Sequence, residues 1–471
     1  MRMPRRKPSF LFTTNSTTSA ASTRKPNRPE LRRAAALLFS AILLGTLLYS
    51  ADNIRFITIQ SHITRSSPRQ LSSLEAEANH ASGPSDPIGI QSAADLFDGA
   101  KKRVLSLHKR DEKEKCDLFD GEWIYDSERE GDEKRRYPLY REDECVFLTE
   151  QVTCMRNGRK DDRYQRWRWQ PRSCSLPRFD AKAFLERLRN KRMMFVGDSL
   201  NRNQWESMVC LVQSILPWDK KTLVKTGSLN VFRAEEYNAT LEFYWAPFLV
   251  ESNSDDPAMH SIRDRIIRPT SILKHGANWN DVDFLIFNTY IWWMNGPKMK
   301  VMRKGIFSRR SVKYEEVERI VAYRRVLRTW SKWVAEHIDP QKTTVFFMSM
   351  SPAHETVTWE NPNAIRCAME TLPIRNSTGR IDVGTDWRLF TIAEDVIQSM
   401  RQVPVHYINI TALSEVRKDA HTSVHTLRKG KVLTPEQQAD PATYADCIHW
   451  CLPGLPDVWN EFLYAKIMSN M

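Results

Sequence analysis

The first 115 residues contain neither cysteine nor tryptophan, although the chain of 471 residues has eight cysteines and 15 tryptophans. This absence excludes a cross-linked or aromatic-rich core from that part of the chain. No glycine-rich nucleotide-binding loop and no internal repeat is evident. With 41% hydrophobic and 27% charged residues, the composition also excludes a disordered or collagenous protein. It leaves room for one large domain or two ordinary ones.

The net charge of +13 is concentrated at the N-terminus. Residues 1–33 contain nine basic residues and a single acid, a net charge of +8, which leaves +5 for the other 438 residues. A net charge of +13 by itself suggests binding to nucleic acid or an acidic polymer. A charge of +5 on the remainder is too small to support a nucleic-acid partner, so no nucleic-acid binding is predicted.

An uncharged stretch at 34–51 follows the basic segment directly. Its 18 residues match the short end of what spans a bilayer, and the preceding basic flank predicts a cytosolic N-terminus. A cleaved signal peptide and a buried core helix are the alternatives. We predict a type II membrane protein of the secretory pathway with four parts: a cytosolic basic tail at 1–33, a transmembrane signal anchor at 34–51, a flexible lumenal stem at 52–112 and a lumenal domain at 113–471.

The cysteines support an oxidising compartment because their number is even and all follow the stem. We expect four disulfides of unknown pairing among Cys116, Cys145, Cys154, Cys174, Cys210, Cys367, Cys447 and Cys451. A zinc pair at Cys447 and Cys451 is the weaker alternative, and no metal site is predicted. Glycosylation sequons at Asn238, Asn376 and Asn409 suit a lumenal domain.

Two regions of different character make up the domain at 113–471. The part up to Phe179 is rich in turns, aromatics and cysteines, which predicts an irregular, disulfide-stapled segment. Short apolar runs then alternate with helical stretches, a pattern typical of an α/β fold whose parallel sheet is flanked by helices. The expected strands are Arg192–Val196, Asp283–Phe287, Thr344–Met348 and Val405–Ile408. The expected helices are Ala181–Arg189, Arg202–Ile215, Glu315–His337 and Asp386–Met400.

A Gly197-Asp198-Ser199 motif ends the first of these strands and opens a helix. Gly197 permits a tight turn, and Ser199 is expected at the helix N-terminus, where free N–H groups and the dipole stabilise a developing anion. This is a suitable place for a nucleophilic serine. The alternative is that Asp198 or Ser199 only caps the helix.

A serine nucleophile needs a base that a carboxylate orients. Asp446 and His449 lie three residues apart and can hydrogen-bond within one short turn, with neighbouring cysteines to hold it. His421 and His354 are alternative bases. Neither has a carboxylate in the neighbouring turn, so we favour His449 and interpret His421 as structural.

These motifs and their context resemble the SGNH/GDSL-type hydrolases and, more specifically, the plant trichome birefringence-like (PC-esterase) family of polysaccharide O-acetyltransferases. The resemblance covers residues 113–471, and the C-terminal run is most similar to the members that acetylate xylan. The matching stretches are CDLFDGEWIYD (116–126), NGRKDDRYQRWRWQP (157–171), FVGDSLNRNQWESMVCLV (195–212), EFYWAPFLVE (242–251), LIFNTYIWW (285–293) and ADCIHWCLPGLPDVWNEFL (445–463). The chain departs from the family at 289–292 and 363–367, which puts the acceptor groove in question but not the triad.

The resemblance implies an acetyl-serine on Ser199, with His449 as the base and Asp446 orienting it, and transfer to 2-O or 3-O of xylosyl residues. It further implies an oxyanion or substrate site that involves the Ser199 N–H and Gly197, Asp198, Asn288 and Arg202. Sugar rings are expected to stack on Trp292, Trp293, Trp450 or Trp459, for which core packing is the alternative. An acetyl donor is required, either acetyl-CoA or an acetylated carrier, but no bound cofactor is predicted.

Three alternatives to a xylan O-acetyltransferase stay open at this point. They are an acetyl esterase, an acetyltransferase for mannan, xyloglucan or pectin, and a non-catalytic polysaccharide-binding protein. A membrane anchor favours modification during synthesis over removal in the wall. The intact set of Ser199, Asp446 and His449 argues against a pure binder.

Overall fold

The computed structural model describes residues 116–127, 137–259, 262, 264–304, 307, 313–355, 365–374 and 383–469. A seven-stranded sheet lies at its centre, made of β3 (Arg192–Gly197), β4 (Lys221–Thr226), β5 (Leu229–Ala234), β6 (Ala239–Trp245), β8 (Phe284–Phe287), β11 (Thr344–Met348) and β12 (Val405–Ile408). The strand order is β12-β11-β8-β3-β6-β5-β4. The pairings from β12 to β6 are parallel, whereas β5 and β4 add an antiparallel edge. The expected α/β fold is confirmed, but the sheet is mixed rather than wholly parallel.

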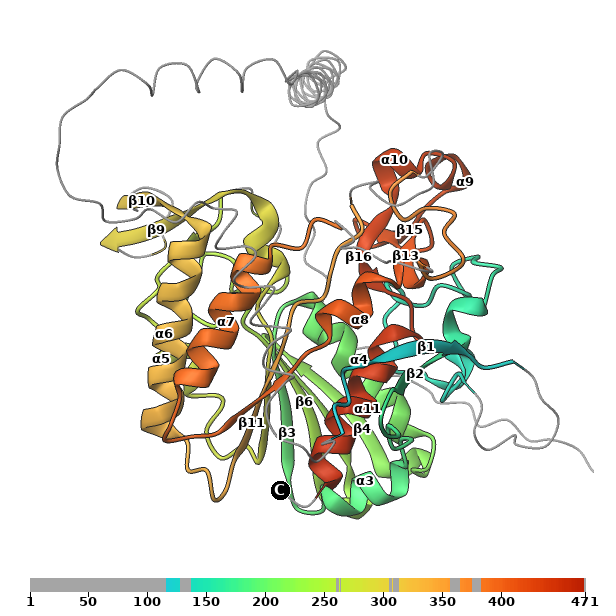
Figure 1. The fold of residues 1–471 in the computed structure, drawn as a ribbon, viewed down its shortest axis with the longest axis horizontal. Helices are drawn as coiled ribbons and strands as arrows, with labels where there is room; N and C mark the ends of the chain where they lie inside the picture. The colour runs from blue at the N-terminus through green and yellow to red at the C-terminus, as the bar shows by residue number, and fades with distance from the viewer. Residues whose placement is uncertain are drawn as a thin grey trace, which may run out of the picture. The chain divides into compact units, whose positions relative to one another are not determined.

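Helices cover both faces of this sheet (Figure 1). On one side lie α6 (Arg319–His337) and α7 (Trp387–Ser399), and on the other lie α3 (Ala181–Arg187), α4 (Ser199–Gln213) and α11 (Leu455–Met468). Nearly every residue of α4 and α11 is buried, because the two helices pack against each other, while α4 also packs against β3 and β6 and α11 against α3. The nucleophile motif therefore opens one of the most enclosed helices of the fold.

The helix predicted at Glu315–His337 begins later than expected. Residues Lys313–Glu318 form β10, which pairs antiparallel with β9 (Lys298–Lys304), and the helix starts at Arg319. The run KYEEVE suits a strand because Glu315 and Val317 are half-buried between exposed neighbours, a period of two. The third strand of this small sheet is β7 (Ile266–Ile267).

Short elements occupy the C-terminal third of the chain. They are β13 (His421–Ser423), which pairs with β16 (Asp446–Trp450), β14 (Leu427–Arg428), which pairs with β15 (Lys431–Val432), and the helices α8 (Thr411–Glu415), α9 (Pro435–Gln438) and α10 (Pro441–Tyr444). Another short helix, α5 (Leu273–Gly276), precedes β8.

The aromatic N-terminal segment is built on two antiparallel strands, β1 (Gly121–Tyr125) and β2 (Trp167–Pro171). Trp123 and Trp169 face each other across this strand pair in an edge-to-face arrangement with their centroids 5.5 Å apart. The Cys116–Cys174 disulfide closes this segment, and Cys145–Cys210 joins it to α4. The prediction of a disulfide-linked, irregular segment is confirmed.

All eight cysteines form disulfides, of which the remaining two are Cys154–Cys451 and Cys367–Cys447. The zinc interpretation of Cys447 and Cys451 is therefore wrong, because each sulfur is bonded to a distant partner. The predicted tail, anchor and stem (1–112) and the sequon at Asn376 lie outside the described residues. Within the described ranges, no helix has the length and apolar character that a membrane span requires.

Candidate active site

Ser199 is the first residue of α4, at the carboxyl end of β3. Asp198 is the N-cap of the helix, and its Oδ1 accepts a hydrogen bond of 2.9 Å from the Leu200 N–H. Gly197 is needed for close packing rather than for a special turn, since a Cβ there would lie 2.5 Å from the carbonyl oxygen of Asn288. The neighbouring strand β8 thus leaves room for the nucleophile only if residue 197 has no side chain.

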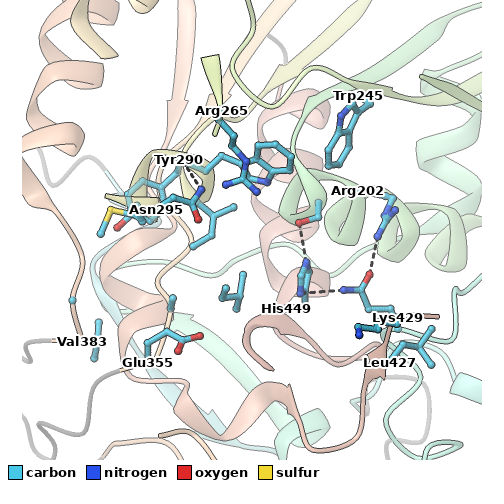
Figure 2. Close-up of a pocket in the computed structure, with 18 of the residues that line it drawn as sticks. Arg202, Trp245, Arg265, Tyr290, Asn295, Glu355, Val383, Leu427, Lys429 and His449 are labelled. Atoms are coloured by element: carbon cyan, nitrogen blue, oxygen red, sulfur yellow. Dashed lines mark hydrogen bonds between the residues drawn. The ribbon is translucent and has the colours of Figure 1, made fainter. Parts of the chain in front are cut away.

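His449 and Asp446 lie on β16 and complete a hydrogen-bonded line with Ser199. His449 Nε2 is 2.8 Å from Ser199 Oγ (Figure 2). His449 Nδ1 is 2.7 Å from Asp446 Oδ2. The other carboxylate oxygen of Asp446 accepts hydrogen bonds of 3.0 Å from the N–H groups of Ile448 and His449. Three side chains predicted from the two ends of the domain are therefore brought into the geometry of a serine–histidine–aspartate triad.

The electrostatics of Asp446 suit an orienting carboxylate. Burial alone would raise the pKa of Asp446, but the charge of His449 and the hydrogen bonds from His449 and Ile448 outweigh burial and hold this pKa well below its usual value. A carboxylate that stays ionised requires the proton of the neutral imidazole to sit on Nδ1. This leaves Nε2 free to accept the proton of Ser199.

Contacts from three parts of the chain hold the short strand β16 in place. Cys447, within the strand, is bonded to Cys367, and Cys451, which follows the strand, is bonded to Cys154. Asn203 of α4 contacts the backbone of Trp450 twice: its Oδ1 accepts from the Trp450 N–H at 2.9 Å, and its Nδ2 donates to the Trp450 carbonyl at 3.2 Å. Because Asn203 lies one helical turn after Ser199, it sets the distance between the nucleophile and the base.

A cavity of about 800 Å³ opens over Ser199 and His449 (Figure 2). Around it lie Gln151, Arg202, Trp245, Arg265, Tyr290, Ile291, Trp292, Met294, Asn295, Ala353, Glu355, Val383, Gly384, Leu427, Lys429, Gly430 and Ile448. Of the two departures from the family, the one at 289–292 lies on the cavity wall, whereas the described part of the other, 365–367, does not line the cavity.

Gln151 connects two of the predicted residues and was not predicted itself. Its Oε1 accepts a hydrogen bond of 2.8 Å from Arg202 Nη2, and its Nε2 lies 3.1 Å from His449 Nδ1. The second contact is a hydrogen bond only when Nδ1 carries no proton, whereas pairing with Asp446 requires one. Gln151 comes from the N-terminal segment with no motif around it, so the sequence held no signal for this contact.

The structure contradicts the oxyanion or substrate role of Asp198 and of the Asn288 side chain. The Asp198 carboxylate is fully buried in its capping contacts, and burial raises its pKa to about 6. The Asn288 amide donates instead to the carbonyl of Ser349 at 3.2 Å, and neither side chain lines the cavity. The backbone N–H of Ser199 has no hydrogen-bond acceptor within the described ranges, and Arg202 reaches the cavity as predicted.

Of the four tryptophans predicted to stack on sugars, only Trp292 lines the cavity. Trp293, Trp450 and Trp459 are at most 1% exposed, so no sugar ring can reach them. Their indole N–H groups donate to Thr289, Ser351 and Ser414 respectively. Core packing is therefore the correct interpretation for these three. Trp245, which was not predicted, also lines the cavity.

His421 and His354 are buried beneath the triad and do not line the cavity. His421 Nδ1 lies 3.1 Å from the carbonyl oxygen of His449, and its Nε2 lies 2.6 Å from His354 Nδ1. Burial lowers the pKa of both imidazoles, that of His354 to about 4. They support the backbone of the base and are not placed to accept a proton from Ser199, which agrees with the structural interpretation of His421.

The fold and this geometry define an SGNH-like site with a serine–histidine–aspartate triad. The chain belongs to the GDSL/SGNH-like acyl-esterase family found in Pmr5 and Cas1p, whose PC-esterase profile matches residues 176–466. The PMR5 N-terminal domain profile matches residues 114–175. The boundary between the two profiles lies just past the Cys116–Cys174 segment.

The curated relatives of this chain include proteins named as plant acetyltransferases. The chain is 66% identical over 358 residues to Xylan O-acetyltransferase 6 of Oryza sativa subsp. japonica and 65% identical over 369 residues to Xylan O-acetyltransferase 7 of the same organism. Both matches cover 75% of this chain, but only 63% and 60% of those proteins. Protein trichome birefringence-like 31 of Arabidopsis thaliana is 44% identical over 378 residues, which cover 80% of this chain and 88% of that protein.

Proposed function

We propose that this protein is a xylan O-acetyltransferase, which moves an acetyl group through an acetyl-serine onto 2-O or 3-O of xylosyl residues. The hydrogen-bonded line from Ser199 through His449 to Asp446, open to a cavity of about 800 Å³, is the observation that carries the proposal. The names of the rice relatives supply the polymer.

In the first step, Ser199 Oγ attacks the carbonyl carbon of the acetyl donor while His449 Nε2 takes the hydroxyl proton. The tetrahedral intermediate collapses to acetyl-serine, and the protonated His449 gives its proton to the leaving group. Asp446 stays ionised and stabilises the imidazolium that forms between the two proton transfers. The donor is acetyl-CoA or an acetylated carrier.

In the second step, a xylosyl hydroxyl replaces the leaving group. His449 accepts its proton, the oxygen attacks the acetyl carbon, and Ser199 Oγ is restored with the proton from His449. Water competes for the same intermediate, and transfer prevails only if the cavity orients a sugar hydroxyl better than it orients water. Trp245 and Trp292 shape the wall for that task, although both are almost fully buried and Trp292 packs against Arg265.

The negative charge of the tetrahedral intermediate needs donors that are in place before the reaction. We assign the Ser199 N–H, which points from the N-terminus of α4 without an acceptor in the described ranges, and the guanidinium of Arg202. Asn288 is not assigned this role because its side-chain amide donates a hydrogen bond to the Ser349 carbonyl.

The remaining parts of the proposal concern the setting of the enzyme. We propose a single-pass type II anchor at 34–51, a lumenal catalytic domain and a Golgi location, on the basis of the charge pattern described above. Four disulfides agree with an oxidising compartment.

Incubation of the full-length chain with acetyl-CoA and xylo-oligosaccharides tests the activity, with products followed by mass spectrometry and NMR. The wild type is expected to add acetyl groups, and Ser199→Ala and His449→Ala are expected not to. The NMR spectrum distinguishes 2-O from 3-O products. Acetate release without transfer selects the esterase alternative, transfer only to mannan, xyloglucan or pectin changes the polymer, and equal activity in Ser199→Ala sinks the mechanism.

A further inference from the structure

The cavity over the triad carries an excess of positive charge. Three cations line it, namely Arg202, Arg265 and Lys429, whereas Glu355 is the one carboxylate among its described lining residues. Glu355 forms an ion pair with Arg366, which does not line the cavity, so its charge is already compensated. The neutral main chain of xylan gives no reason for this excess.

The three cations differ in how far their charge is compensated. Arg202 lies 3.6 Å from the buried carboxylate of Glu206. Lys429 is exposed, so water solvates its ammonium group. Arg265 is half-buried, and within the described ranges it forms no ion pair and no hydrogen bond, with its Nε enclosed and unbonded. Arg265 is therefore the informative cation.

Trp292 holds the guanidinium of Arg265 in a defined orientation. The carbon at the centre of the guanidinium lies 3.8 Å from the centroid of the Trp292 ring, a cation–π contact that leaves the guanidinium edge available. Figure 2 shows Arg265 and Lys429 on opposite sides of His449 in this view. An arginine edge presents parallel N–H donors that match a carboxylate or a phosphate.

Holding this cation without a counter-charge is unfavourable. Burial lowers the pKa of Arg265, and no carboxylate of the described residues raises it again. Partly buried charges are normally paired, and an unpaired one in a cavity beside reactive groups indicates a ligand of opposite charge.

We propose that Arg265, stacked on Trp292, binds an anionic group of the substrate, a carboxylate or a phosphate, while the acetyl group reacts at Ser199. The inference rests on the proposed function and adds a substrate class to it. A carboxylate comes from an acidic sugar branch on the acceptor, and a phosphate comes from a donor such as acetyl-CoA. Both use the same bidentate contact with the guanidinium.

Two acceptors and two donors, assayed in all combinations with the full-length chain, distinguish these sources. The acceptors are a neutral xylo-oligosaccharide and one of equal length that carries a glucuronic acid branch. The donors are acetyl-CoA and the uncharged p-nitrophenyl acetate. The variant Arg265→Gln removes the charge but keeps a planar polar group, Arg265→Lys keeps the charge but loses the fork, and Arg189→Gln is the control at an exposed arginine of the α3–β3 connection.

For Arg265→Gln we expect KM to rise about 10- to 100-fold for the anionic partner, since a charge-assisted contact is lost. With the neutral acceptor and the neutral donor, the rise in KM is expected to be much smaller than with the anionic partner, because the lost charge has no counter-charge there. Arg265→Lys is expected to lie between the wild type and Arg265→Gln, and Arg189→Gln to match the wild type. A rise confined to the branched acceptor identifies the carboxylate, and one confined to acetyl-CoA identifies the phosphate.

The proposal is overturned if Arg265→Gln leaves every KM unchanged, or if it weakens all four combinations equally. Failure of the proposed function has a different signature, because Ser199→Ala would then transfer acetyl groups with at least one combination. Retained melting temperature in Arg265→Gln confirms that the comparison is made on folded protein.

Discussion

The two halves of the site are held by different means. Ser199 follows β3, whose neighbours on both sides are parallel strands, and opens α4, of which 13 of 15 residues are buried. His449 and Asp446 lie on β16, whose one ladder partner among the described strands is the three-residue β13. Burial in the sheet core positions the nucleophile, with one disulfide further along α4 at Cys210, whereas the base depends on two disulfides and on backbone hydrogen bonds beside it.

This difference follows from the size of the surrounding core. A strand inside a seven-stranded sheet has backbone partners on both edges and apolar contacts on both faces, so its end is defined to a fraction of an ångström. A two-stranded ladder is marginal by itself and needs other supports. The Cys154–Cys451 disulfide supplies one of these supports from the N-terminal segment, so the base depends on a region outside the α/β domain.

The largest expected effect is common to both halves, because the chemistry needs both. Replacement Asp446→Asn removes the charge that stabilises the imidazolium and favours the wrong tautomer of His449. We expect kcat to fall by a factor on the order of 10³ to 10⁴, with little change in melting temperature. Steady-state acetyl transfer by purified variants measures it, and a loss below tenfold would contradict the role of Asp446 in orienting the base.

The second prediction tests whether the Cys154–Cys451 disulfide positions the base. The double replacement Cys154→Ser with Cys451→Ser frees β16 on one side, and we expect kcat to fall by about 10- to 100-fold because a displacement near 1 Å misaligns the base. Unfolding is expected to become easier by about 2 to 5 kcal/mol.

The matched control is Cys116→Ser with Cys174→Ser, which opens the disulfide of the β1–β2 segment and leaves those flanking His449 intact. It is expected to lower the free energy of unfolding but to keep kcat within about twofold. If both double variants lower kcat equally, the disulfides act only through global stability and the comparison fails.

The third prediction concerns the direct contact between the halves. Replacement Asn203→Ala leaves the buried N–H and carbonyl of Trp450 without their side-chain partner. This is expected to lower the free energy of unfolding by about 1 to 3 kcal/mol. We expect kcat to fall by several-fold to about tenfold as β16 shifts relative to Ser199. Gln213→Ala is the control, since Gln213 is buried at the other end of α4 and donates to the Glu144 carbonyl, far from β16 in the chain. Its kcat is expected to match the wild type.

The smallest effect is a difference in pH dependence between the two halves. Glu461 of α11, behind the nucleophile helix, accepts a hydrogen bond from Tyr137, and burial raises its pKa to about 7. Its contribution to stability is present below the ordinary glutamate pKa of 4.5 and is lost as pH rises through 7. Glu461→Gln is expected to remove this loss, which amounts to at most about 3 kcal/mol. Chemical denaturation at several pH values measures it.

The base half is expected to show the opposite sign. His354 has a pKa near 4, against an ordinary value of 6.5, because it is buried beneath β16. Its contribution is present above 6.5 and is lost as pH falls towards 4. His354→Gln should therefore flatten the acidic side of the stability profile and leave the alkaline side as in the wild type. If the free energy of unfolding of both variants changed with pH in the same way, the two halves would not differ in pH dependence.

Features that depend on neighbouring residues in the chain were predictable. The strands Thr344–Met348 and Val405–Ile408 are where their apolar runs placed them, and α4 follows Gly197-Asp198-Ser199. The even cysteine count predicted four disulfides correctly. The antiparallel edge of β4 and β5 was missed because their residues are polar on the exposed face and give no buried run.

Site residues that act through space were predicted less well. In the sequence, Trp293, Trp450 and Trp459 are as suitable for sugar stacking as Trp292. Only the structure shows that these three are buried and that Trp292 alone of the four lines the cavity. Asn288 follows a strand as expected, but whether its amide meets a ligand or the Ser349 carbonyl depends on the neighbouring strand β11. Gln151 and Arg265 stand outside every motif, so nothing nearby in the chain marks them.

By itself, the sequence determined which chemistry is available: a serine at a strand-to-helix turn, an aspartate and a histidine three residues apart, and eight cysteines that all lie after residue 115. Periodicity and turn chemistry depend on residues close together in the chain, so they can be recognised from the sequence alone. Only the tertiary structure decided which cysteines pair, which aromatic faces the cavity and which arginine lacks a counter-charge. Each of those depends on distances between segments tens to hundreds of residues apart, which chain closure and core packing set together.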